Sequence, residues 1–289
     1  MSVASAIFMR IFYNALWFCF VTLGGAQAAS PSPATAIPFD YCEGLLWVQV
    51  QVPQSTRPLN FILDTGADVS VIDAGTAKTL GLKTGSRISV QGVHATMTGH
   101  WPARLTAKAG DLILPSKYLA LDLSKLAHSC GRPLDGLLGA DFIRDRVVQI
   151  DFASHQIRFP DEVAPAASDT VVPLELSGKS ICVSIGINGR ERQRVRLDTG
   201  CATALQWVTA DTKMLRQSDK PAVGLTKLAI PQAETTASLG TSRFDRVPTG
   251  IHHTAIFPDE AGLLGNGLLS RFKTVTIDTK SARLVLGPI

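Results

Sequence analysis

Hydrophobic and polar residues alternate along several short segments, which is the pattern of a β-strand with one buried face. Leu45–Val52 alternates in this way, and Ile181–Ile187 is followed by Asn188-Gly189, a strong hairpin signal. Strand pairs around polar turns are predicted in Val147–Phe159 and in Thr274–Leu286. The pattern therefore predicts a mainly β chain.

Short helices are predicted at three places between these strands. The first is Ala74–Leu80, which ends just before Gly81, a residue that favours helix termination. The other two, Ala140–Arg144 and Gly267–Phe272, each follow a Gly-Leu-Leu-Gly segment.

The chain also repeats itself over a long period. Four motifs occur in the same order in each half, 126 to 135 residues apart: Ala36–Tyr41 with Val171–Leu176, Phe61–Gly66 with Val195–Gly200, Gly136–Gly139 with Gly262–Gly265, and Val148–Asp151 with Val275–Asp278. A repeat of this length predicts a duplicated domain rather than a solenoid of short units. The Pro-, Ala- and acid-rich segment Phe159–Asp169 suits a linker, so we expect lobes over residues 29–165 and 166–289.

Composition supports a folded core and argues against a nucleic-acid surface. Hydrophobic residues make up 45% of the chain and charged residues 18%, and the net charge is only +4. The densest basic segment places Arg190, Arg192, Arg194 and Arg196 at alternate positions, which predicts the solvated face of a strand. Aromatic residues are 7% of the chain, too few to interleave with a basic patch.

The first 28 residues have the features of an export signal. Arg10 precedes a mostly apolar stretch, residues 11–25, and Ala26-Gln27-Ala28 has the small-x-small form of a cleavage site. We expect cleavage after Ala28, no stable membrane insertion afterwards, and a periplasmic or secreted location; an uncleaved membrane anchor is the alternative. The remaining cysteines, Cys42, Cys130, Cys182 and Cys201, allow three disulfide pairings, and their spacing favours none of them.

Candidate chemistry lies at two equivalent positions of the repeat. Asp64 and Asp198 each end an apolar strand and begin an Asp-Thr-Gly sequence. One such tripeptide is weak evidence, because Asp and Gly are common turn residues. Two of them in a duplicated fold can bring their carboxylates face to face, where the pair shares one proton. The ionised member can then activate a water while the protonated member donates to an amide carbonyl.

These motifs resemble those of aspartic peptidases of the pepsin and retropepsin type. An apolar Asp-Thr-Gly strand followed by an apolar-apolar-Gly strand is the family pattern in each half, and the resemblance covers roughly Ile37–Leu286. Leu-Asp-Thr-Gly-Ala-Asp and Gly-Leu-Leu-Gly-Ala-Asp-Phe look most like retropepsin-like bacterial proteins. The resemblance implies a bilobal acid-protease fold with the site between the lobes, a monomer, and no metal or other cofactor.

The resemblance also implies roles for individual residues. Asp64 and Asp198 would be the catalytic pair, and Thr65 and Thr199 would hydrogen-bond across the lobe junction.

Three further positions match the family motif in the two loops. Gly66 and Gly200 would offer backbone N–H groups to the carboxylates, and Asp68 would contact the substrate backbone. The equivalent of Asp68 in the second lobe is Ala202, so that contact would be one-sided.

The chain departs from the pepsin pattern three residues after each Asp. Ala67 and Cys201 stand where pepsin-like enzymes often carry a hydroxyl that stabilises the ionised carboxylate. Without that hydrogen bond the pair should titrate higher, which predicts activity at mildly acidic pH. Cys201 is either a redox-responsive thiol or a small buried side chain in place of Ala.

A flap is expected between each Asp loop and its Gly-Leu-Leu-Gly. We place the first in Ser89–Ala103, with its tip in His94–Gly99, and the second around Pro231–Gly240. Trp101 could pack over substrate or into the core.

Other catalytic signatures are missing from the sequence. The six histidines form no H-E-x-x-H motif and no G-x-S-x-G elbow occurs. We therefore expect an aspartic endopeptidase acting on peptides or proteins. The rival is a weakly active or inactive peptidase-like module that binds peptides or proteins in the cell envelope.

Overall fold

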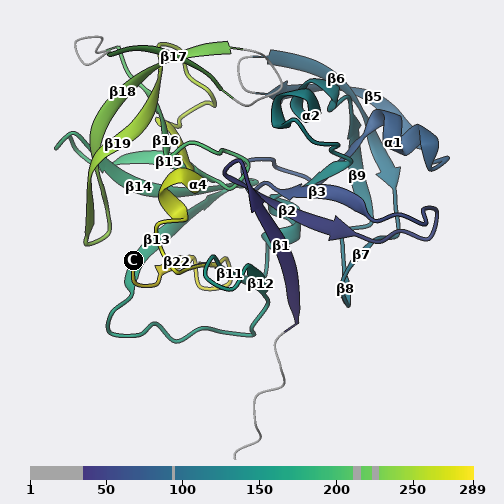
Figure 1. The fold of residues 1–289 in the computed structure, drawn as a ribbon, viewed down its shortest axis with the longest axis horizontal. Helices are drawn as coiled ribbons and strands as arrows, with labels where there is room; N and C mark the ends of the chain where they lie inside the picture. Colours follow the sequence, from purple (N-terminus) through teal and green to yellow (C-terminus); the bar gives the residue numbers. More distant parts are fainter. Residues whose placement is uncertain (1–34, 93–94, 211–215, 223–227) are drawn as a thin grey trace, which may run out of the picture. The chain divides into compact units, whose positions relative to one another are not determined.

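The computed structural model describes residues 35–92, 95–210, 216–222 and 228–289 (Figure 1). The predicted signal peptide, residues 1–28, lies outside the described residues, and so does the start of the predicted first lobe. Within these ranges no helix combines the length and the hydropathy of a membrane-spanning segment. The described residues belong to one unit, Ala34–Ile289.

Strands dominate both halves of this unit, so the prediction of a mainly β chain is confirmed. The N-terminal half contains β1 (Ala36–Cys42), β2 (Leu45–Val50), β3 (Leu59–Leu63), β4 (Val71–Asp73), α1 (Ala74–Thr79), β5 (Thr84–Gly92), β6 (Ala95–Arg104), β7 (Lys108–Ala109), β8 (Leu112–Ile113), β9 (Lys117–Leu121), α2 (Ser124–Cys130), β10 (Gly136–Leu138), α3 (Ala140–Ile143), β11 (Val147–Asp151) and β12 (Gln156–Arg158).

The described residues of the C-terminal half form a similar series of strands but fewer helices. It contains β13 (Thr170–Ser177), β14 (Ser180–Ile187), β15 (Gln193–Asp198), β16 (Leu205–Val208), β17 (Arg216–Ala222), β18 (Leu228–Leu239), β19 (Ser242–His252), β20 (Gly262–Gly265), α4 (Asn266–Leu269), β21 (Thr274–Asp278) and β22 (Arg283–Leu286). The predicted boundary at residues 165 and 166 falls between β12 and β13, where the chain has no strand or helix.

The two halves pair their strands in the same way. In the N-terminal half β10 runs parallel to β3 and antiparallel to β4, and β4 runs parallel to β9. In the C-terminal half β20 runs parallel to β15 and antiparallel to β16, and β16 runs parallel to β19. Each Asp-Thr-Gly therefore follows a central strand in an equivalent position.

One antiparallel sheet joins the halves. Its order is β1, β12, β11, β21, β22 and β13, and the contact between halves is the pairing of β11 with β21, from Val147 opposite Asp278 to Asp151 opposite Thr274. The predicted strand pairs in Val147–Phe159 and Thr274–Leu286 are both present. Ile150 and Val275, which pair across the junction, are fully buried, so apolar burial fastens the halves together.

The strand β2 is buried on both faces, although its sequence alternates. Leu46, Val48 and Val50 pack into the large core cluster, whereas Leu45 and Trp47 on the other face pack into a second, smaller cluster. Only Gln49 of this strand is exposed. The face of β2 that carries Leu45 and Trp47 is therefore covered as well, because the strand lies between the two core clusters.

The three predicted helices are confirmed, with small shifts at their ends. α1 begins after Asp73, whose side chain accepts from the backbone N–H of Thr76 at 2.9 Å, and Gly81 after it has φ +65°. α3 and α4 follow the two Gly-Leu-Leu segments as expected. The sequence analysis missed α2, which has no side-chain cap at Leu123.

Candidate active site

The two Asp-Thr-Gly loops are each held by a neighbouring strand. The backbone N–H of Asp64 donates to the carbonyl of Leu138 at 2.8 Å, so β10 runs directly beside the first loop. In the other half Asp198 lies opposite Gly265 in the parallel pairing of β15 with β20. Both Gly-Leu-Leu-Gly segments therefore support the loops, which explains why the motifs recur together.

The loops bring Asp64 and Asp198 together, so that each carboxyl group affects the pKa of the other. A Cβ atom added to Gly66 would lie 2.5 Å from Cγ of Asp198, and one added to Gly200 would lie 2.5 Å from Cγ of Asp64. Each carboxyl group is thus packed on the glycine of the opposite loop. Only glycine leaves room for it.

Backbone N–H groups of its own loop also bind each carboxyl group. Oδ1 of Asp64 accepts from Gly66 at 3.0 Å and from Ala67 at 3.1 Å. Oδ1 of Asp198 accepts from Gly200 at 2.9 Å. These donors fix the orientation of the two carboxyl groups relative to the loops.

Thr65 and Thr199 form a symmetric hydrogen-bonded lattice under the carboxyl groups. The hydroxyl of Thr65 donates to the carbonyl of Leu197 at 2.6 Å, and the hydroxyl of Thr199 donates to the carbonyl of Leu63 at 2.8 Å. Each hydroxyl also accepts from the backbone N–H of the other threonine at 3.0 Å. Because both side chains are buried, this lattice ties the two loops together rigidly.

The environment raises the pKa of both carboxyl groups. Burial is the main cause for each, since it penalises the charged form. The pKa of Asp198 rises further because the charge of Asp64 lies beside it. The two carboxyl groups can therefore share one proton, and the pKa of Asp198 is raised further than that of Asp64.

Cys201 is a neutral thiol next to this pair. Burial, and then the charge of Asp198, raise its pKa to about 12. Its sulfur lies 3.2 Å from the hydroxyl of Thr203. A thiol with so high a pKa is a poor nucleophile, which favours the small-side-chain interpretation over a redox role. Cys42, Cys130, Cys182 and Cys201, all within the described residues, are free cysteines.

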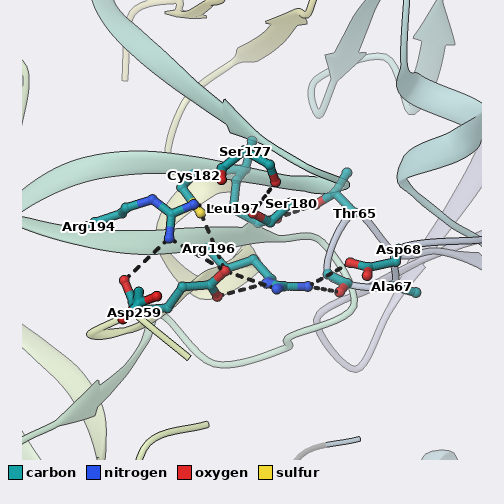
Figure 2. Close-up of polar contacts among 12 residues, drawn as sticks. Thr65, Ala67, Asp68, Ser177, Ser180, Cys182, Arg194, Arg196, Leu197 and Asp259 are labelled. Atoms are coloured by element: carbon teal, nitrogen blue, oxygen red, sulfur yellow. Dashed lines mark hydrogen bonds and ion pairs between the residues drawn. The ribbon is translucent and has the colours of Figure 1, made fainter. Parts of the chain in front are cut away.

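Asp68 lies at the end of the first loop and forms an ion pair with Arg196, which the sequence analysis expected on a solvated strand face. Its carboxylate accepts from Nη1 of Arg196 at 3.1 Å (Figure 2). Arg190 and Arg192 are exposed as predicted but precede the strand β15. On the strand itself the prediction of a solvated face is wrong: Arg194 is half-buried and Arg196 is only 7% exposed. Arg196 is buried because its charge is neutralised inside the protein.

Arg196 connects the two halves of the site. Nη1 also donates to the carbonyl of Gly66 at 2.8 Å, while Nε and Nη2 donate to the two carboxylate oxygens of buried Glu260 at 2.8 and 2.9 Å. Its guanidinium lies 3.8 Å from the ring centroid of Phe257. The positive charge lowers the pKa of both Asp64 and Asp198, against the effect of burial.

Asn266 is a second supporting residue that the sequence analysis missed. Its amide nitrogen donates to the carbonyl of Thr199 at 2.7 Å and to that of Gly44 at 2.8 Å. It follows Gly265, whereas Ala140 follows the equivalent Gly139, and this difference between the repeats was the available signal. For Arg196 the signal was the strand period, which places it on the same face as Asp198.

The flaps differ from the prediction in their bounds. β5 and β6 form a hairpin over Thr84–Arg104. Residues 96–99 of the predicted tip pair with β5 as part of strand β6, and His94 lies outside the described residues. Trp101 on β6 is half-buried, packs on the smaller core cluster and also lines a surface hollow.

In the C-terminal half the equivalent hairpin is β17 with β18, joined by residues 223–227, which lie outside the described residues. Pro231–Gly240, the predicted second flap, is mostly the rest of β18 and reaches the turn at its far end. In the described part of the chain, no three His, Cys, Asp or Glu side chains are grouped so as to hold a metal ion.

Comparison with known proteins agrees with this architecture. Residues 48–142 match the family model described as aspartyl protease. The crystal structure of an aspartic proteinase from Irpex lacteus is similar to the fold with a TM-score of 0.54 at 13% sequence identity, over 88% of this chain and 97% of that one. No sequence among the curated proteins matches the chain. Residues 48–142 therefore resemble the aspartyl protease family, and the chain shares the fold of a pepsin-like aspartic proteinase.

Proposed function

We propose that the protein is an aspartic endopeptidase whose catalytic pair is Asp64 and Asp198. The observation that carries the proposal is the close approach of two carboxyl groups, buried Asp198 and half-buried Asp64, each packed on the glycine of the opposite loop. A single chain supplies both halves of the pair, so we expect a monomer to be active. Its substrates would be peptides or proteins that enter between the two halves.

The proposed reaction follows from the proton that the pair shares. Ionised Asp64 takes a proton from a water molecule, and the resulting hydroxide equivalent attacks the amide carbonyl carbon. Protonated Asp198 donates its proton to the carbonyl oxygen, which gives a tetrahedral gem-diol. Collapse of the gem-diol breaks the C–N bond, returns a proton from one hydroxyl to Asp198, and transfers the proton on Asp64 to the leaving nitrogen. No covalent enzyme adduct forms, and the pair is restored.

The lattice and Arg196 support this chemistry without touching the substrate. Thr65 and Thr199 keep the two loops at a fixed separation, which maintains the contact between the carboxyl groups. Arg196 offsets part of the cost of burying negative charge beside the protonated carboxyl group.

The test is cleavage of a diverse peptide mixture by the wild type and by Asp64→Asn and Asp198→Asn. We expect the wild type to cut at mildly acidic pH, a pepstatin-type inhibitor to block it, and each substitution to abolish cutting. Asp122→Asn, at an exposed carboxylate, is the matched control and should retain full activity.

Two outcomes would contradict the proposal. Wild-type protein that cleaves nothing in the mixture between pH 3 and pH 7 would favour the rival binding module, and cutting that survives both substitutions would exclude the pair as the catalyst. We also propose that the signal is cleaved after Ala28 and that the mature chain lies in the periplasm or the medium. N-terminal sequencing of the exported wild-type protein tests this cleavage.

A further inference from the structure

A hollow of about 400 Å³ lies beside the first catalytic loop. Its apolar wall comes from Val69, Trp101 and Pro115. Val69 is the fifth residue after Asp64, and Trp101 lies on the flap strand β6, so a peptide held at the catalytic pair would pass this opening. We refer to it as the Trp101 hollow.

Three cationic side chains line the same hollow from three separate elements. Lys117 is at the start of β9, Arg144 follows α3, and Lys179 is in the turn between β13 and β14. Over the ranges that the structure describes, no hydrogen bond or ion pair engages any of these three side chains. Cations that lack a local partner raise the positive potential of a concave surface, so the hollow attracts negative charge.

The two acidic residues that line the Trp101 hollow are already engaged. Asp68 accepts from Arg196, as described above. Asp141 accepts from the backbone N–H of Ser70 at 2.8 Å and from its hydroxyl at 2.7 Å. Three cations against these two acids leave the hollow with a formal charge of +1, and Asp68 is already paired with Arg196.

A neighbouring hollow of about 420 Å³ shows that this imbalance is local. It shares Asp68 and Lys179 with the first hollow, but three acids and three cations line it: Asp68, Asp259 and Glu260 with Lys179, Arg194 and Arg196. Its formal charges cancel, and it gives no basis for selecting a substrate by charge. A charge preference is expected from the Trp101 hollow alone.

We propose that the Trp101 hollow selects peptides in which an acidic side chain is adjacent to an apolar one. The apolar side chain would pack on Val69, Trp101 and Pro115, and the carboxylate would meet the cations at the rim. The inference rests on the proposed peptidase activity for its role in cleavage, but the binding preference stands on the hollow itself.

The size of the preference follows from the exposure of the cations. Lys117 and Lys179 are exposed and Arg144 is half-buried, so each pairing with a carboxylate is weak on its own. Three together should favour a Glu-containing peptide over its Gln counterpart by about tenfold in kcat/KM. Because the cations are accessible to solvent, added salt should reduce the preference.

The test uses three pools of randomised peptides that differ only in a central Phe-Glu, Phe-Gln or Phe-Lys pair. We expect the wild type to cut the Phe-Glu pool about tenfold faster than the Phe-Gln pool and the Phe-Lys pool slowest. The variant Lys117→Gln/Arg144→Gln/Lys179→Gln should cut the Phe-Glu and Phe-Gln pools at equal rates. The matched control Lys78→Gln/Lys83→Gln/Lys125→Gln removes the same charge from exposed positions elsewhere and should keep the preference.

Binding measured by calorimetry on the Asp198→Asn variant separates this inference from the proposed function. If the wild type cuts no pool while the Phe-Glu pool still binds about tenfold more tightly than Phe-Gln, the peptidase proposal fails and the selectivity stands. Equal binding and equal cutting of the Phe-Glu and Phe-Gln pools would overturn the selectivity. So would a preference that survives in the triple-glutamine variant of the hollow.

Discussion

Replacement of Arg196 by Met tests whether the buried charge cluster holds the site together. The substitution keeps a long apolar side chain but removes the guanidinium, and it leaves the carboxylate of Glu260 without its main partner. The side chains of Arg196 and Glu260 are only 8% and 3% exposed. The remaining polar contacts of Glu260 are weak: Sγ of Cys182 at 3.7 Å and Nη1 of Arg194 at 3.8 Å.

The expected loss of stability is large for one side chain. Breaking a buried ion pair by removing one partner costs about 3–5 kcal/mol, because the other charge stays buried and unpaired. That is a substantial part of the roughly 5–15 kcal/mol by which native proteins are stable. The double variant Arg196→Met/Glu260→Gln removes the orphaned charge, so it should be more stable than Arg196→Met alone.

Urea unfolding followed by tryptophan fluorescence measures these differences. Arg243→Met is the matched control, because Arg243 pairs with Asp245 at 3.6 Å with both side chains more than 70% exposed, and it should cost less than about 1 kcal/mol. The reasoning is refuted if Arg196→Met lies within about 1 kcal/mol of the wild type, or if adding Glu260→Gln restores nothing.

The same variant makes a prediction about pH. The charge of Arg196 favours the ionised forms of Asp64 and Asp198 and so lowers both pKa values. Removing it should raise them, which moves both limbs of the pH–rate profile of cleavage to higher pH. A purely structural role would lower the rate without moving the profile.

Three further predictions concern the catalytic pair and its loops. Gly66→Ala should lower kcat at least about 100-fold, because the new Cβ would lie 2.5 Å from Cγ of Asp198. A kcat within tenfold of the wild type would contradict the close packing of the Asp198 carboxyl group on Gly66. Asp198→Asn should raise the melting temperature at pH 7 but change it little near pH 3. The pKa of Asp198 is raised in the folded state, so the wild type loses stability as the pH rises above the unfolded-state pKa of this carboxyl group. Equal shifts of the melting temperature at both pH values would be evidence against this. Cys201→Ala should cut peptides as the wild type does under reducing and oxidising conditions, because a thiol with a pKa of about 12 is unreactive, and a variant that alone resists oxidative inactivation would restore the redox interpretation.

Repetition made much of the fold readable from the sequence. The second copy of each motif showed that the strands ending in Asp64 and Asp198 were equivalent, and the two Gly-Leu-Leu-Gly segments lie beside those loops as the motifs implied. Gly81 indicated the end of α1, and the structure adds that Asp73 caps its beginning. α2 was missed because it is short and has no side-chain cap at its N-terminus, although Gly131 with φ +62° ends it as Gly81 follows α1.

The second flap was harder to place because β18 pairs with both β17 and β19, and a turn signal in the sequence does not show which of the two hairpins is the flap. Gly240, with φ +59°, does lie in a turn, but that turn joins the C-terminal end of β18 to β19. Residues 223–227 precede the N-terminal end of β18. The strand pairing, which connects residues distant in sequence, was needed to identify the hairpin equivalent to β5 and β6.

By itself, the sequence determined the strands, the duplication and the two carboxylates, because periodicity and repeated motifs are local properties of a chain. Only the tertiary structure decided what surrounds those carboxylates. Arg196 is one of several arginines at alternate positions, and the strand period places it on the same face as Asp198 without showing whether its charge is buried. It is buried because Asp68 and Glu260, 128 and 64 residues away, meet it in space. Whether a charge is solvated or buried depends on the partners that folding assembles around it.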